Sequence, residues 1–184
     1  MKKIGKNKKI SILLGLIAIL NYSNYTFASV GAVIQNVDPA GTGPGQWPTP
    51  RFESAKKADN STCADAEYDK LTGLMWAKDG NAAGAKNWTD AKTYANTLNL
   101  CGYNDWRLPT INELASLVNY SDKDSPSHWL NSNGFNNIQL GPYWSSSDYS
   151  LSGGYACGVN MNFGYVGNSS QKFNNSVLPV RGPN

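Results

Sequence analysis

The stretch that decides the fold is CGYNDWRLPTINELASL, residues 101–117. Pro109 restricts the residue before it to extended geometry. Thr110 then offers a hydroxyl as the N-cap of a helix, and Glu113 can return a hydrogen bond to the Thr110 amide, which is the arrangement of a capping box. Apolar residues follow at helical spacing, at positions 111, 114, 117 and 118. The stretch therefore predicts a turn that leads into a short amphipathic helix over residues 111–119.

A second helix and a strand are predicted before this stretch. Thr89 can cap a helix over residues 90–100, and Gly102 follows its end, where a left-handed conformation is needed. The apolar run TGLMWA at residues 72–77 predicts a short strand.

The last third of the chain is typical of β-structure. Residues 155–163 alternate with a period of two, which predicts one apolar face made of Tyr155, Cys157, Val159, Met161 and Phe163. A long polar segment at 121–142 precedes an expected strand at 143–147. A turn is expected at 164–168, and two further strands are expected after it, at residues 172–173 and 177–181. Two helices followed by short strands predict an α+β domain.

The first 28 residues have the composition of a secretory signal. Five lysines precede an apolar run at residues 10–20, and small residues precede a cleavage point after Ala28. An uncleaved signal anchor is the alternative, although the apolar run is short for a membrane span. The sequence thus predicts an exported bacterial protein that stays periplasmic, reaches the cell surface or is secreted, with no membrane span after cleavage.

Removal of the signal changes the charge. The mature part keeps eleven Lys and Arg against thirteen Asp and Glu, a net charge of −2 instead of the +3 of the whole chain. A net anionic chain disfavours non-specific binding to nucleic acid.

Three segments are expected along the chain. Residues 1–28 form the signal peptide, 29–62 an extended leader, and 63–184 the folded domain. Residues 29–52 are rich in Gly and Pro, which is typical of a linker, and their glycines do not recur every third residue as in collagen.

All three cysteines lie in the mature part, at positions 63, 101 and 157. Because an exported protein meets an oxidising compartment, one disulfide and one free thiol are expected. Three pairings are possible. We favour Cys63–Cys101, which would tie the first segment of the domain to the end of its first helix, and expect a free Cys157 to be buried.

Six motifs follow one another in a recognisable order: TGLMW (72–76), LCGYNDWRLPT (100–110), NEL (112–114), YWSSS (143–147), VNMNFG (159–164) and VLPVR (177–181). Together they resemble the Lcl C-terminal domain family, a bacterial domain named for the tail of a collagen-like adhesin. The resemblance covers residues 63–181.

This resemblance implies a C-type-lectin-like fold, also found in sulfatase-modifying enzymes, with two helices packed on a twisted antiparallel sheet and long loops. The tail of the adhesin is a trimeric binder of sulfated glycosaminoglycans, so the resemblance also implies glycan recognition and makes a trimer one expected oligomeric state. This chain lacks a collagen repeat and carries a negative mature charge, and both differences argue against the same ligand and the same trimer.

The motif residues Trp76, Trp106, Arg107, Trp144 and Arg181 are interpreted as structural. Tryptophan buries a large area and needs one partner for its N–H group. Arg107 is expected in a buried or half-buried pair with Asp105 or with a backbone carbonyl.

No catalytic or metal-ligating set is recognisable. His128 is the single histidine, which leaves no zinc set, and the serines at 145–147 lack a G-x-S-x-G elbow. Calcium needs six to eight oxygens, and the loop at 121–125 offers two carboxylates. The sequence therefore predicts no enzyme, no metal and no cofactor.

Candidate ligand-binding residues are the aromatic residues of polar segments and the nearest cations: Trp129, Tyr149, Tyr165, Lys123 and Lys172. Aromatic faces flanked by Asn and Ser suit stacking on sugars, and the same rings could equally pin loops onto the core. We expect an exported, adhesin-like, non-enzymatic binding module for a polysaccharide or surface glycan. The alternative is an accessory component of a cell-envelope, pilus or secretion assembly that binds protein partners.

Overall fold

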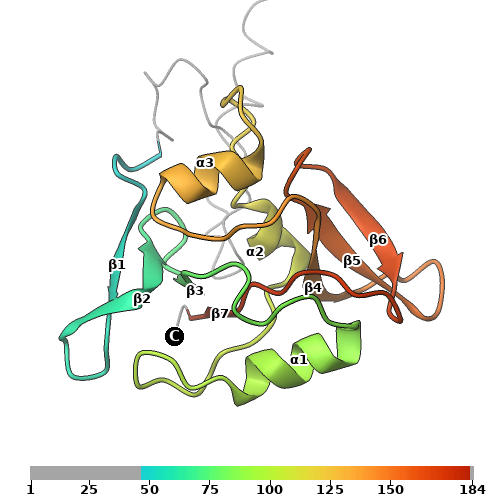
Figure 1. The fold of residues 1–184 in the computed structure, drawn as a ribbon, viewed down its shortest axis with the longest axis horizontal. Helices are drawn as coiled ribbons and strands as arrows, with labels where there is room; N and C mark the ends of the chain where they lie inside the picture. The colour runs from blue at the N-terminus through green and yellow to red at the C-terminus, as the bar shows by residue number, and fades with distance from the viewer. Residues whose placement is uncertain (1–46, 183–184) are drawn as a thin grey trace, which may run out of the picture. The chain divides into compact units, whose positions relative to one another are not determined.

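The structure is a computed structural model that describes residues 47–182. The expected signal peptide and the leader up to residue 46 lie outside the described residues. The elements, in chain order, are β1 (Phe52–Lys56), β2 (Thr62–Asp69), β3 (Met75–Ala77), α1 (Trp88–Thr97), α2 (Ile111–Ala115), α3 (Pro126–Ser132), β4 (Pro142–Asp148), β5 (Tyr155–Asn160), β6 (Val166–Ser170) and β7 (Val180–Arg181) (Figure 1).

The strands form two antiparallel sheets, with the orders β1-β2-β3-β7 and β4-β5-β6. The α+β class expected from the sequence is confirmed. The described residues contain three helices and two sheets, however, instead of two helices and one sheet. The likeness to C-type lectins stays a prediction.

The short strand β7 connects distant parts of the chain. Val180 is paired with Trp76 of β3 on one side. On the other side, Val180 and Arg107 exchange two backbone hydrogen bonds of 2.9 Å. The last strand therefore lies between β3 and the segment that leads into α2.

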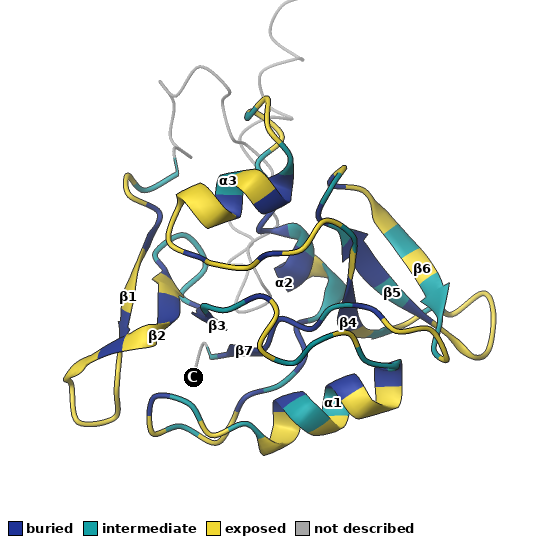
Figure 2. Ribbon diagram, in the orientation of Figure 1, coloured by how far each residue is buried: buried dark blue, intermediate teal, exposed yellow. Residues whose placement is uncertain are grey.

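The motif tryptophans lie in the hydrophobic core, where Trp76, Trp106 and Trp144 are almost completely buried. The indole N–H of Trp144 donates to the Lys86 carbonyl at 2.8 Å, and that of Trp106 donates to the Leu100 carbonyl at 3.2 Å. Trp76 Nε1 has no partner among residues 47–182. In Figure 2 the buried residues gather on α2, β4 and β5, whereas β6 is exposed or intermediate.

The capping box predicted for α2 is confirmed. Glu113 N donates to the Thr110 hydroxyl at 3.3 Å, and Thr110 N donates to the Glu113 carboxylate at 2.7 Å. The helix ends at Ala115, four residues before the expected end at 119, because the next amides donate to carbonyls three residues back instead of four: Leu117 N to Leu114 at 3.2 Å and Val118 N to Ala115 at 3.1 Å.

Helix α1 begins at Trp88, two residues before the predicted start. Asn87, not Thr89, is the N-cap, and its side chain accepts from Asp90 N at 2.9 Å. Asn is at least as good an N-cap as Thr. The Trp88 indole also fixes this end of the helix by donating to the Ser145 carbonyl at 2.7 Å.

Helix α3 lies inside the long polar segment at 121–142, where no helix was expected. The Ser125 hydroxyl accepts from His128 N at 3.2 Å, and Pro126 occupies the first helical turn, where its missing N–H costs nothing. This Ser-Pro start is visible in the sequence, but the helix is too short for a clear apolar periodicity.

The β5–β6 hairpin also departs from the prediction. Strand β6 covers residues 166–170, where a turn was expected, and the turn lies before it. Tyr155 and Phe163 are exposed, although the alternation placed them on the buried face. The buried side chains of the strand are Ala156 and Val159, with Met161 just beyond its end. The buried face changes after Gly158, which packs directly against the Tyr143 backbone.

The fold includes residues upstream of the predicted boundary at Cys63. Strand β1 lies within the expected leader and pairs with β2. Arg51 is buried, donates to both carboxylate oxygens of Asp69 at 2.8 and 2.6 Å, and donates to the Ser116 carbonyl at 2.9 Å. The Gly- and Pro-rich composition does not predict this segment, because it is held by the contacts of Arg51 and by a few apolar residues that are inconspicuous in the sequence.

Candidate functional site

The five candidate ligand-binding residues do not form one site. Tyr149 follows β4 and Lys172 follows β6, at the end of the second sheet where Gln171 N donates to the Gly154 carbonyl at 2.8 Å. Tyr165 lies at the opposite end, in the turn between β5 and β6. Trp129 lies on α3, and Lys123 lies in the loop before α3.

Trp129 packs against the core. Its ring meets Trp47 edge-on at a centroid distance of 5.3 Å and Phe52 at 5.8 Å. The Phe52 ring in turn meets the Phe135 ring edge-on, at a centroid distance of 5.0 Å. Trp129 and Phe135, which both belong to polar segments of the sequence, thus pin α3 and the following loop onto β1.

The turn between β5 and β6 carries exposed aromatic rings. Tyr120, Phe163 and Tyr165 are 74%, 70% and 56% exposed. The rings of Phe163 and Tyr165 are nearly parallel, with an interplanar angle of 10° and a centroid distance of 6.2 Å. The Tyr120 hydroxyl donates to the Gly164 carbonyl at 2.6 Å, which joins the loop after α2 to this turn. We call these three side chains the aromatic surface.

Local hydrogen bonds fix the turn that presents the rings. The Asn160 side-chain oxygen accepts from Asn162 N at 2.9 Å and from Phe163 N at 3.2 Å. Gly164 N donates to the Asn160 carbonyl at 2.7 Å, and Gly164 has a φ of +79°, which L-residues rarely adopt. A Cβ at Gly164 would come within 2.9 Å of Val118. The rings therefore stand on a backbone with little freedom.

Tyr165 is held from both sides. The Asn160 side-chain amide donates to its hydroxyl at 3.3 Å, and a Cβ at Gly167 would lie 3.3 Å from the ring. Of this surface, Tyr165 was predicted from the sequence to bind ligand, and Phe163 was expected on the buried face. Tyr120 was not predicted, because its approach depends on a contact across 44 residues.

The motif arginines are held by ion pairs. Arg107 donates to both Glu113 oxygens at 2.8 and 2.7 Å and to the Gly182 carbonyl at 3.0 Å. The expected backbone-carbonyl contact is present, but Asp105 is not the partner of Arg107. Asp105 accepts from Arg181 at 2.7 and 3.0 Å, because β7 brings Arg181 to it. This hydrogen bond lowers the pKa of Asp105.

The expected Cys63–Cys101 disulfide is confirmed. Such a bond is typical of oxidising compartments, so it indicates an extracytoplasmic domain. Cys157 is free and only partly buried, not fully buried as expected, because its neighbours Ala156 and Gly158 occupy the buried face of this part of β5. Its thiol approaches the Asp148 carbonyl at 3.7 Å.

The remaining polar candidates have ordinary contacts. His128 is exposed and pairs with Asp124 at 3.0 Å. The Ser145 hydroxyl donates to the Cys157 carbonyl at 2.8 Å, and that of Ser146 to the Pro109 carbonyl at 3.2 Å. Among residues 47–182, no three His, Cys, Asp or Glu side chains gather as a metal site would require. The same residues include no helix of the length and apolarity needed to cross a membrane.

Residues 66–181 match the family model of the Lcl C-terminal domain. The matched region covers more than half of the chain, so the protein belongs to the Lcl C-terminal domain family. No curated protein matches the chain.

Proposed function

We propose that this protein is an exported, non-enzymatic binding module that recognises a polysaccharide or surface glycan through the aromatic surface. The single observation that carries the proposal is the exposure of Phe163 and Tyr165 on a turn that is fixed by hydrogen bonds, with the exposed Tyr120 bonded to the same turn. Large exposed apolar side chains gathered at one place mark interaction sites more often than chance.

The geometry suits sugars in two respects. Nearly parallel ring planes offer flat apolar faces on which the C–H face of a sugar can pack, and covering one ring contributes roughly 1.5–3 kcal/mol. The side-chain amide of Asn162 lies in the same turn and can pair with sugar hydroxyls. Because the backbone is already fixed, little ordering entropy opposes binding.

The local charge favours an uncharged glycan. Lys123, the candidate cation three residues after Tyr120 in the sequence, lies between Asp122 and Asp124, so this stretch of the loop is net negative. A sulfated chain would meet repulsion there. We therefore place neutral polysaccharides ahead of sulfated glycosaminoglycans as ligands.

A glycan array probed with the exported chain tests the proposal. The double variant Phe163→Ala/Tyr165→Ala should lose at least tenfold in affinity for the glycans that the wild type binds. Phe173→Ala is the matched control, because Phe173 is equally exposed but follows β6 at the other end of the sheet. Equal loss in both variants, or a wild-type protein that is folded and binds nothing on the array, contradicts the proposal. In the second case an envelope protein partner becomes the better hypothesis.

A further inference from the structure

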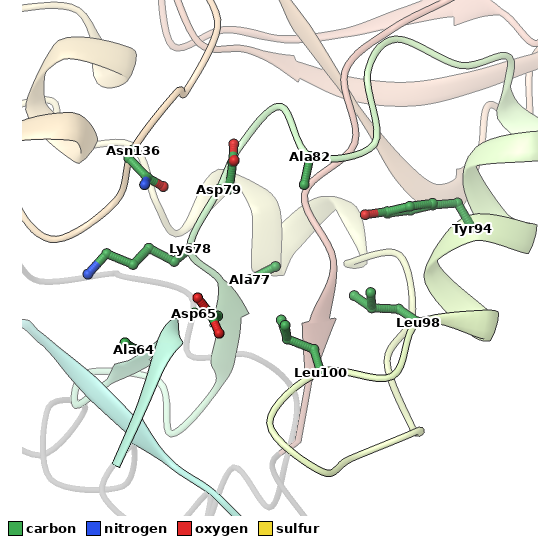
Figure 3. Close-up of a pocket in the computed structure, with 10 residues that line it drawn as sticks. All are labelled: Ala64, Asp65, Ala77, Lys78, Asp79, Ala82, Tyr94, Leu98, Leu100 and Asn136. Carbon is green, nitrogen blue, oxygen red and sulfur yellow. The ribbon is translucent and has the colours of Figure 1, made fainter.

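A pocket far from the aromatic surface has no role in the proposed function. It has a volume of about 330 Å³ and lies between β2, the loop after β3 and the C-terminal part of α1 (Figure 3). This volume is at the lower end of the range for small-ligand sites. Its lining residues are Ala64, Asp65, Ala77, Lys78, Asp79, Ala82, Tyr94, Leu98, Leu100 and Asn136.

Backbone pairing makes one wall of the pocket rigid. Lys78 N donates to the Asp65 carbonyl at 3.0 Å, and Asn136 N donates to the Lys78 carbonyl at 3.1 Å. Gly80 N then donates to the Asn136 carbonyl at 2.9 Å. Three segments that are distant in sequence thus form one continuous wall.

The opposite wall is joined to β2 by a covalent bond. Leu100 lines the pocket next to Cys101, and Ala64 lines it next to Cys63. The disulfide therefore sets the spacing between the two walls. A pocket with both walls fixed keeps its shape when it is empty, which favours binding.

The pocket carries uncompensated negative charge. The Lys78 ammonium lies 2.7 Å from the buried carboxylate of Glu67, which neutralises it. Within residues 47–182, neither Asp65 nor Asp79 forms an ion pair. Lys86 lies outside the lining, with its ammonium 5.6 Å from the Tyr94 ring centroid.

Within the described residues, the hydrogen bonds that the Asp79 side chain accepts all go to one of its carboxylate oxygens. Asn81 N and the Asn137 amide both donate to its Oδ1, at 2.9 and 3.2 Å. In Figure 3 the Tyr94 hydroxyl points into the pocket. Burial and the charge of Asp79 raise the pKa of Tyr94, so its hydroxyl stays protonated, and the hydroxyl oxygen can accept a hydrogen bond from an ammonium group.

The rest of the lining is aliphatic and comes from Ala64, Ala77, Ala82, Leu98 and Leu100. A sugar in the pocket would leave hydroxyls against these side chains without partners, which costs free energy. An unbranched alkyl chain with a cationic end meets no such cost, because its methylene groups pack on the aliphatic side chains.

We propose that this pocket binds a lysine side chain of a partner polypeptide, with its ammonium group paired with the Asp65 carboxylate and attracted further by the charge of Asp79. The four methylene groups of lysine lie against the aliphatic lining. This inference does not depend on glycan binding, since the aromatic surface shares no residue with the pocket.

Titration of the exported chain with Nα-acetyl-lysine methylamide, followed by backbone amide chemical shifts, tests the proposal. We expect saturable shifts at lining residues such as Ala64 and Ala77. Nα-acetyl-norleucine methylamide, which lacks the ammonium group, should bind at least tenfold more weakly. Equal binding of the two probes, or no shift at the lining with either, overturns the proposal, as does tighter binding of glucosamine than of the lysine probe.

Matched variants distinguish the effect of a lost carboxylate charge on binding from the effect of a disturbed fold. Asp65→Asn/Asp79→Asn should weaken binding of the lysine probe at least tenfold, whereas Asp148→Asn, at an exposed position of β4, should leave it within twofold. Should the double variant unfold, Asp65→Asn alone, at an exposed position of β2, gives the same test with an expected loss of at least threefold. Unchanged binding in a folded Asp65 variant contradicts the assignment. Glycan-array results for the aromatic variants bear only on the proposed function.

Discussion

Cys63 and Cys101 are joined by a disulfide, and the residue next to each of them lines opposite walls of the same pocket. The bond closes a segment with a sequence separation of 38 residues that contains most of β2, together with β3 and α1. It therefore acts on the stability of the domain and on the shape of the pocket together.

Removal of this disulfide should destabilise the domain. The variant Cys63→Ser/Cys101→Ser is expected to lose roughly 2–4 kcal/mol of unfolding free energy, since an open chain of this length gains conformational entropy when unfolded. Urea unfolding of the wild type, with and without reductant, measures the same difference. Cys157→Ser is the control and should change little, because that thiol is free. A reduced wild type as stable as the oxidised one contradicts this prediction.

The Glu113 carboxylate should be needed for stability. It is buried and accepts hydrogen bonds from both Arg107 terminal nitrogens and from Thr110 N. Glu113→Gln turns an amide N–H₂ toward these donors and should cost about 2 kcal/mol. Glu53→Gln is the control: Glu53 is an exposed partner of Lys70 at 3.8 Å, so its loss should cost less than about 0.5 kcal/mol. Chemical denaturation of both variants gives the comparison.

Acid should weaken the fold through Glu113 and Asp105. Burial raises the pKa of Glu113, but hydrogen bonds from Arg107 and Thr110 outweigh it, and the net pKa lies below its ordinary value. The pKa of Asp105 is lowered by Arg181. Carboxyls with a lower pKa when folded stabilise the domain above their unfolded pKa, and this contribution disappears as the pH falls through the folded pKa.

The unfolding midpoint should therefore be flat near neutral pH and fall below about pH 4. Glu113→Gln should show a shallower decline, because it lacks one of the two carboxyls. Parallel declines in the wild type and in this variant would assign the acid sensitivity to other groups.

Gly164 should be intolerant of substitution. Its φ is positive, and a Cβ at this position would lie only 2.9 Å from Val118, so Gly164→Ala should lose about 1–3 kcal/mol and disturb the aromatic surface. Gly153→Ala is the control, because a Cβ there would have no heavy atom within 4 Å. Thermal unfolding gives the stabilities, and glycan affinity should fall in the Gly164 variant only. Equal stability of the two variants contradicts the prediction.

Local features of the fold could be predicted from the sequence. The capping box of Thr110 and Glu113 is a four-residue pattern, and the structure contains both of its hydrogen bonds. The α+β class follows from helical spacing before residue 120 and short apolar runs after 143. The sequence favours the Cys63–Cys101 disulfide because it ties the first segment of the domain to the end of its first helix, and the structure contains this bond.

Features set by distant contacts could not be predicted. The choice of Glu113 over Asp105 as the partner of Arg107 depends on where β7 places Arg181, 76 residues away from Asp105. The division into two sheets depends on strand order, which local alternation does not contain. The candidate ligand residues are aromatic residues in polar segments, and this pattern does not distinguish a ring that packs on the core from one that is exposed. Trp129 packs on Phe52, whereas Tyr165 is exposed.

The position of β7 has a consequence for biogenesis. The first sheet is complete only when β7 pairs with β3, and β7 lies at the end of the described residues. Asp105 then binds Arg181, and Arg107 binds the Gly182 carbonyl. A chain that crosses a membrane amino end first therefore completes this sheet only when β7 arrives. Both cysteines of the disulfide emerge well before it, so oxidation can precede the closing of the core.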